Sequence, residues 1–259
     1  MSPQLPATQT AKRIVLLFLF AGALARAAAV PIPEHTVILV AFGDSTTAPR
    51  ERLEVYSELL EKRLKAKTPA ARVINAGVRG NNTEDASSRF QKDVLDQKPD
   101  LVVIQFGIND SAVDVWKQPP ADKPRVDLKV FRNHLQYFIR TLKTRGVKVV
   151  LMTPNPLRWT ARLRELYGKA PYHPEDPEGM NRLLHTYAAA VRELALEESV
   201  ALVDVDAAFR DYARGHGTLD DLLLDGMHPN QQGQRIVAEM LGRTVVDLLQ
   251  LRKARRSSL

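Results

Sequence analysis

Short apolar runs alternate with amphipathic stretches along most of the chain beyond residue 36. The apolar runs are rich in Val, Ile and Leu and show little polar alternation. This pattern is typical of strands that are covered on both faces, as in a parallel sheet. It predicts five strands, at residues 37–42, 72–75, 101–106, 147–152 and 200–205.

The stretches between these runs carry apolar residues at helical spacing. The clearest stripe ends at Gly146, a residue suited to a helix C-terminus, and consists of Phe131, Leu135, Phe138, Ile139 and Leu142. Two further stripes lie within residues 184–194 and 236–248, the last in a helix that starts near Asn230. Five strands alternating with helices predict an α/β fold, namely a flavodoxin-like three-layer α/β/α sandwich with a parallel sheet of about five strands.

Length and composition favour one domain. The chain has 259 residues, of which 44% are hydrophobic, enough for a single well-buried α/β domain at residues 30–250. Residues 153–179, after the fourth predicted strand, are rich in proline and break the alternation of strands and helices. We interpret them as an insertion at the rim of the sheet, where long loops are often functional. Residues 251–259 form a basic tail that we expect to be solvated and frayed.

The N-terminus predicts export. Lys12 and Arg13 precede an apolar run over residues 14–24, and Ala-rich residues follow it. This order is typical of a secretory signal peptide at residues 1–29, cleaved after Ala27 or Ala29. The alternative is a signal anchor, but the run is well short of the ~20 residues that span a bilayer, and Arg26 interrupts it. We therefore expect a periplasmic or extracellular protein without stable membrane insertion after cleavage.

Charge and cysteine content exclude several classes of site. Removing Lys12, Arg13 and Arg26 lowers the formal net charge from +7 to +4, and no basic stripe is interleaved with aromatics, so we expect no nucleic-acid partner. The chain has no cysteine, which excludes disulfides, zinc–thiolate sites and thiol nucleophiles. The histidines show no spacing suited to a metal, so we assign no metal and no cofactor.

Small polar residues follow the predicted strands, at the edge where open parallel sheets bind ligands. Gly43-Asp44-Ser45 follows the first strand, and Gly80 and Asn109 follow the second and third. The segment from Asp225 to Asn230 follows the fifth strand and a helical stretch.

Together these residues predict a serine hydrolase. Ser45 is the candidate nucleophile, His228 the general base, and Asp225 the residue that orients the His228 ring. The backbone N–H groups of Ser45 and Gly80 and the side-chain amide of Asn109 are the candidate oxyanion donors. Taken alone, Ser45 also suits a helix N-cap and Gly80 a turn, so the prediction rests on the whole set.

The sequence resembles the SGNH hydrolases, also called the GDSL esterase/lipase superfamily. Four blocks occur in the order of that family: "FGDST" around Ser45, "NAGVRGNNT" with Gly80, "GIND" with Asn109, and "DGMHP" with Asp225 and His228. Thr46 stands where the name-giving leucine would be, which bears on the lipase label more than on the hydrolase label. The G-x-S-x-G elbow of the α/β-hydrolases is absent.

The resemblance implies an acyl-serine mechanism and an ester substrate, small or polysaccharide. The polar, Pro-rich rim favours short acyl esters, especially acetyl groups on carbohydrates, with Arg158 and Trp159 as candidate substrate contacts. Trp159 suits equally a hydrophobic cluster under the long loop. Two alternatives remain: a lysophospholipase or thioesterase of the same family, and a carbohydrate-binding protein without turnover. The oligomeric state is not predicted.

Overall fold

The computed structural model describes residues 36–50 and 52–256, together with Met1. The chain divides into two units, Met1–Glu34 and His35–Leu259. The predicted signal peptide lies, apart from Met1, outside the described residues. Among the residues that are described, no helix is long and apolar enough to cross a membrane.

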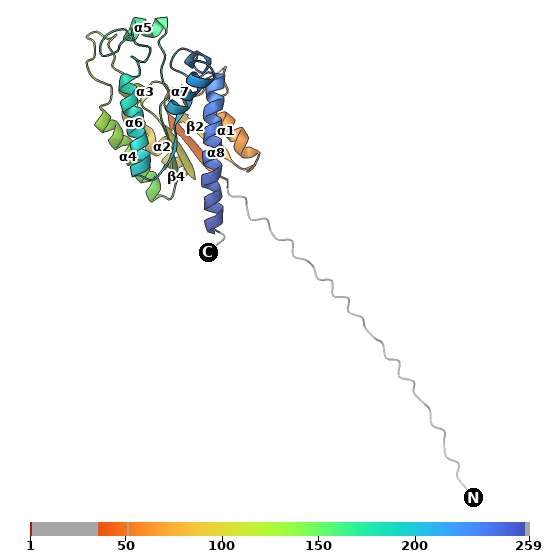
Figure 1. Cartoon of the computed structure of the whole chain (residues 1–259). Coiled ribbons are helices and arrows are strands. Elements are labelled where there is room, and N and C mark those ends of the chain that lie inside the picture. The colour runs from red at the N-terminus through yellow and green to blue at the C-terminus, as the bar shows by residue number, and fades with distance from the viewer. Residues whose placement is uncertain (2–35, 51, 257–259) are drawn as a thin grey trace. The chain divides into compact units, whose positions relative to one another are not determined.

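A five-stranded parallel sheet forms the centre of the second unit (Figure 1). The strands lie in the order β2-β1-β3-β4-β5, and every neighbouring pair is parallel. Their bounds are β1 Ile38–Gly43, β2 Arg72–Gly77, β3 Leu101–Gln105, β4 Lys148–Met152 and β5 Ala201–Val203. The predicted fold class and all five predicted strands are confirmed.

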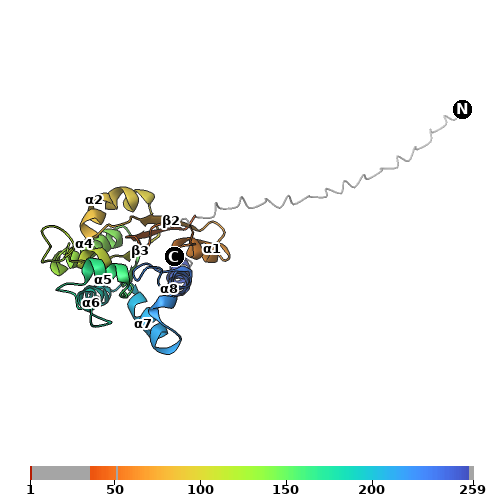
Figure 2. The ribbon, with the colours of Figure 1, turned by 90° about the horizontal axis from the view of Figure 1, so that it is seen from above.

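Helices cover both faces of the sheet, as the view along its strands shows (Figure 2). One face packs against α2 Thr83–Asp93, α4 Leu128–Thr144 and α6 Arg182–Glu197, whose buried side chains join those of the strands in one core cluster. The other face packs against α1 Tyr56–Lys65, α7 Val205–Gly215 and α8 Gln231–Arg256 in a second cluster. Two cores, one on each side of the sheet, explain why the strands lack polar alternation.

The strand and helix ends differ from the predictions by a few residues, for local reasons. β5 stops at Val203 rather than at residue 205, because the Asp204 side chain accepts a hydrogen bond from Ala207 N (3.1 Å) and starts α7. α8 continues to Arg256, so the helix extends into residues that the sequence analysis assigned to a frayed tail.

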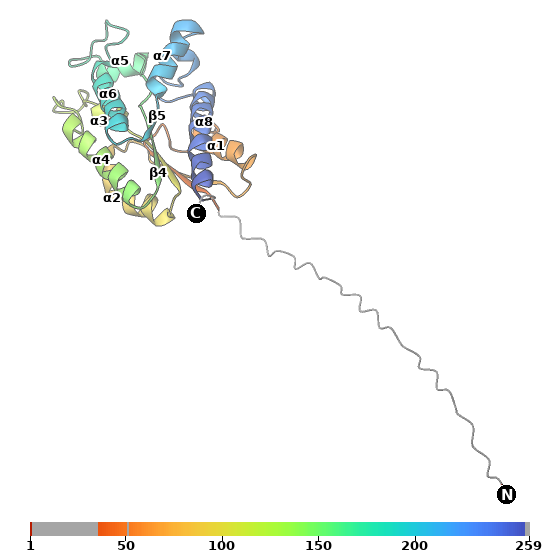
Figure 3. The same ribbon diagram turned by 60° about the horizontal axis from the view of Figure 1, so that its bottom comes forward.

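Short elements lie mostly where the chain leaves the sheet. The 3₁₀ turns are η1 Leu95–Gln97 and η2 Leu219–Asp221; the short helices α3 Ile108–Ser111 and α5 Ala161–Tyr167 follow β3 and β4. Figure 3 shows α5 and one end of α7 at the same end of the unit. The chain runs from β1 outward to β2 and then returns to β3 on the other side of β1. Such a reversal opens a crevice beyond the carboxyl ends of the central strands, and Ser45 follows β1 there.

Candidate active site

Ser45, His228 and Asp225 form a continuous hydrogen-bonded chain. Ser45 Oγ lies 2.9 Å from His228 Nε2. His228 Nδ1 lies 2.8 Å from Asp225 Oδ2 and 3.1 Å from Oδ1. With the Nδ1 proton facing the carboxylate, Nε2 is free to accept the proton of the serine hydroxyl. The structure thus brings together the three residues that the sequence analysis selected, from the turn after β1 and from the loop before α8.

The Asp225 carboxylate is fixed by its own loop. Its Oδ1 accepts hydrogen bonds from Met227 N (3.1 Å) and His228 N (2.9 Å) as well as facing the imidazole. Burial raises the pKa of Asp225, but the hydrogen bonds from the His228 side chain and backbone outweigh it and hold the pKa well below its ordinary value. Asp225 therefore stays ionised and keeps the imidazole in one orientation.

The three candidate oxyanion donors each keep an N–H group without a partner among the described residues. Among the described residues, the backbone N–H groups of Ser45 and Gly80 have no hydrogen-bond partner. Gly80 has a φ of +79°, and a Cβ there would meet nothing within 4 Å, so the space in front of it is open. The Asn109 side chain, only 9% exposed, uses one amide hydrogen on Asn81 O (2.9 Å) and keeps the other. These donors suit the oxygen of a tetrahedral intermediate.

Arg89 links the ends of two strands to the loop that carries Gly80. Its Nη2 donates to Gly43 O (2.9 Å) and its Nη1 to Ala76 O (2.7 Å), while Nε donates to the side chain of Asn81 (2.7 Å). The guanidinium lies 4.6 Å from the centroid of the Phe42 ring. One side chain therefore holds β1, β2 and the neighbour of Gly80 in a single arrangement.

Two buried acids support the same region. Asp44 Oδ1 accepts from Thr46 N (2.8 Å) and lies 2.8 Å from the Thr46 hydroxyl, which gives the threonine at the family's leucine position a structural part. Asp110 accepts from Thr83 N (2.8 Å) and from Gly107 N (3.0 Å). Burial raises the pKa of Asp110 to about 6, and it also raises that of Asp44.

The start of the predicted rim insertion holds the loop that carries the base. Asn155 Nδ2 donates to Met227 O (2.9 Å), and the backbone N of Arg158 donates to Gly226 O (2.8 Å). Gly226 has a φ of +85°, and a Cβ there would approach Arg158 O to 2.4 Å. The close approach explains why glycine stands between Asp225 and the histidine.

Of the two alternatives that the sequence left open for Trp159, the structure favours the buried hydrophobic cluster. Trp159 is only 7% exposed, and its Nε1 donates to Asp176 O (2.9 Å) inside a cluster with Leu163, Tyr167 and Tyr172. The ring thus packs under the rim rather than facing a ligand in solvent. The Arg158 guanidinium pairs with Asp220 and donates to Trp159 O (3.1 Å).

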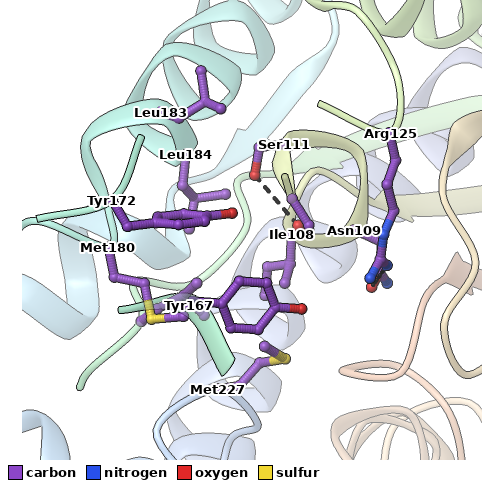
Figure 4. Close-up of a pocket in the computed structure, with 12 residues that line it drawn as sticks. Ile108, Asn109, Ser111, Arg125, Tyr167, Tyr172, Met180, Leu183, Leu184 and Met227 are labelled. Atoms are coloured by element: carbon purple, nitrogen blue, oxygen red, sulfur yellow. Dashed lines mark hydrogen bonds between the residues drawn. The ribbon is translucent and has the colours of Figure 1, made fainter. Parts of the chain in front are cut away.

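A small cavity lies beside Asn109 (Figure 4). Its volume is about 30 Å³, and its walls include Ile108, Leu157, Leu184 and Met227. Figure 4 shows the Tyr167 ring and the Met180 and Met227 side chains gathered at one side of this space. A volume of this size holds about two water-sized groups.

Within the described part of the chain, no group of three or more acidic, His or Cys side chains could hold a metal ion. The sequence analysis did not select Arg89 or Asn155, which hydrogen-bond to the segments that carry Gly80 and His228. Of these two, Asn155 carries a signal, since it is a polar residue three positions beyond the end of the fourth predicted strand.

Comparison with known proteins places the chain in context. Residues 41–236 match the GDSL-like Lipase/Acylhydrolase family. An uncharacterized lipoprotein, YqeF, from Bacillus subtilis (strain 168) is 33% identical over 78% of this chain and 86% of its own length. An acetylxylan esterase from Geobacillus stearothermophilus is 31% identical over 67% of this chain and 72% of its own. The crystal structure of Axe2, an acetylxylan esterase from Geobacillus stearothermophilus, superimposes with a TM-score of 0.64 at 27% identity, covering 80% of this chain and 93% of that one.

Proposed function

The chain belongs to the GDSL-like lipase/acylhydrolase family, and we propose that it is a serine esterase that removes short acyl groups, above all acetyl, from carbohydrates. The observation that carries the proposal is the hydrogen-bonded chain from Ser45 through His228 to Asp225 beside three unused donors. A serine paired with a base, an oriented base and an oxyanion site are the parts that acyl transfer requires.

In the proposed reaction Ser45 Oγ attacks the ester carbonyl while its proton passes to His228 Nε2. The carbonyl oxygen becomes an oxyanion that accepts hydrogen bonds from Ser45 N, Gly80 N and Asn109 Nδ2. The C–O bond to the alcohol then breaks, and the alcohol leaves with the proton from His228. Water then attacks the acyl-serine while His228 takes a proton from it. The bond between the acyl carbon and Ser45 Oγ breaks, Oγ takes the proton back from His228, and the carboxylic acid is released.

Two observations support a short acyl group. The cavity that Asn109 and Met227 help to line has room for about two water-sized groups, and we propose that it takes an acetyl group rather than an alkyl chain. One relative that the chain resembles along most of its length is an acetylxylan esterase. The proposed metal-free mechanism uses only groups of this chain, and we propose no cofactor.

We also propose export. A related protein is a lipoprotein, and the N-terminal sequence has the features of a signal peptide. This chain has no cysteine to carry a lipid on a thiol, so we propose release into the periplasm or the medium.

Hydrolysis of aryl esters of increasing chain length, beside acetylated xylo-oligosaccharides, tests the proposal. We expect kcat/KM to be highest for acetyl esters and to fall with each added methylene, and Ser45→Ala to abolish turnover. Preference for long-chain esters would favour the lysophospholipase or thioesterase alternative. Sugar binding without hydrolysis, equal in wild type and Ser45→Ala, would favour a binding protein.

A further inference from the structure

The orientation of the Asn109 amide is set by two contacts on opposite sides. Nδ2 donates to Asn81 O (2.9 Å), and Oδ1 accepts from Arg125 Nη1 (3.0 Å). Reversing the amide would set an NH₂ group against the guanidinium and an oxygen against a carbonyl. Both contacts therefore keep the NH₂ group on the side of Gly80, where the proposed oxyanion forms.

Arg125 itself is clamped by a buried carboxylate. Its Nη2 donates to Asp114 Oδ1 (2.7 Å), and its Nε lies 3.1 and 3.2 Å from the two carboxylate oxygens. Asp114 is 3% exposed and Arg125 is 28% exposed. A bidentate ion pair of this kind fixes the orientation of the guanidinium, so that Nη1 points at Asn109.

We propose that Arg125 is a positioning residue for the oxyanion site, acting through Asn109 and held by Asp114. The inference rests on the proposed esterase function. A cation hydrogen-bonded to the amide oxygen withdraws electron density from the amide nitrogen, so that its remaining N–H becomes a stronger donor as negative charge develops. Arg125 thus fixes the direction of the donor and increases its strength, without contacting the ester.

Arg125→Met on the full chain is the central variant. We expect kcat for an acetyl ester to fall about tenfold with KM nearly unchanged, because Asn81 O still holds one side of the amide. Wild type and Ser45→Ala, assayed first, establish whether the proposed function holds before any Arg125 variant is interpreted.

A double-mutant cycle separates positioning from general damage. Asn109→Ala removes the donor, so adding Arg125→Met to it is expected to lower kcat no further. If the two effects multiply instead, Arg125 acts independently of Asn109 and the proposal is overturned.

Loss of Arg125 also removes the guanidinium from the buried Asp114 carboxylate, which keeps its ion pair with Lys117 (2.7 Å), and this weakened pairing needs its own control. Arg125→Met combined with Asp114→Asn removes that charge. We expect thermal stability to recover and kcat to stay low. Recovery of kcat in this double variant would show that the buried charge, and not the lost contact to Asn109, caused the defect.

Arg125→Lys keeps a positive charge next to Asp114, so this variant is expected to fold even if Arg125→Met does not. A single ammonium cannot span the carboxylate and Asn109 together, so we expect a folded protein with reduced kcat. Wild-type kcat in this variant contradicts the proposal. Arg140→Met is the matched control. Arg140 lies on α4 and pairs with Glu198 (2.9 Å), the nearly buried residue that caps the C-terminus of α6, so we expect the variant to change stability but not kcat.

Discussion

The two halves of the candidate site are built in different ways. The candidate nucleophile and the candidate oxyanion donors follow β1, β2 and β3, and Ser45 and Asn109 are each 9% exposed. The base stands on a loop that joins η2 to α8, where the Asp225 side chain is 53% exposed. The oxyanion half is held by side chains with buried charges, such as Arg89 and Asp110, whereas the base loop is held mainly through backbone groups.

The difference follows from what each half has to do. Donors stabilise an oxyanion only if they already point at it before the charge appears, so dense polar packing around Asn109 is an advantage. The base has to accept and return a proton, and its imidazole needs one orientation fixed by Asp225. A short loop that accepts hydrogen bonds from the segment after β4 is sufficient for this.

The largest expected effect comes from the base half. We expect His228→Ala to lower kcat by about 10⁴-fold or more, because no other group can take the serine proton. Asp225→Ala should be milder by about 10- to 100-fold, since it removes the orienting group and leaves the base itself. Single-turnover kinetics on an acetyl ester measure both, and equal losses would mean that the carboxylate does more than orient the ring.

Asn109→Ala is expected to have the next largest effect, on the oxyanion half. Removal of one oxyanion donor should lower kcat by about 10²- to 10³-fold with little change in KM or in melting temperature. Steady-state kinetics together with thermal unfolding test this. If KM rises while kcat stays unchanged, Asn109 contributes to substrate binding and not to stabilising the transition state.

A pair of glycine variants tests how the base loop is supported. Gly226→Ala would place a Cβ 2.4 Å from Arg158 O, so we expect a loss of stability above 1 kcal/mol and about a tenfold lower kcat. Gly146 also has a positive φ but open space around it, and it lies before β4, away from the strand ends that carry the site. Gly146→Ala should destabilise by about 1 kcal/mol with unchanged kcat. Urea unfolding and steady-state kinetics on both variants test this. Equal kcat values in the two variants would show that Arg158 does not support the loop that carries His228.

The smallest effect concerns pH and the oxyanion half. Because burial raises the pKa of Asp110 to about 6, the folded state keeps a proton that the unfolded state loses near pH 4. The free energy of unfolding should therefore fall as the pH rises from about 4 to about 6, and level off above. Asp110→Asn removes this contribution. Urea titrations across that pH range should show a free energy of unfolding that depends less on pH in the variant. An unchanged dependence would mean that other groups cause it.

The fold was predictable because the central strands β1, β3 and β4 are apolar and almost completely buried. The exact ends of the strands and helices were less predictable. β5 stops early because Asp204 caps α7, and the pattern of hydrophobic residues does not indicate that hydrogen bond. Ser45, Gly80, Asn109 and His228 could be selected because residues that follow parallel strands meet at one edge.

Other parts of the site depend on the paths of loops. Arg125 lies 16 residues beyond Asn109, in a segment without periodicity, and nothing in the sequence indicates that it returns to the amide. Trp159 is an aromatic residue in a polar, Pro-rich stretch, and the sequence alone leaves open whether it faces solvent or a core. The structure places it in a cluster of buried apolar residues that the rim segment shares with α3 and α6.

The packing of this segment under the rim affects how such a protein can change over evolutionary time. The segment after β4 supports the base loop through the Arg158 backbone and the buried Asn155, while its charged side chains, such as Arg162 and Glu165, project into solvent. Outward-facing positions can therefore be replaced freely while the inner ones are retained. A lineage could acquire new substrate preferences at this rim and keep its proton-transfer machinery intact.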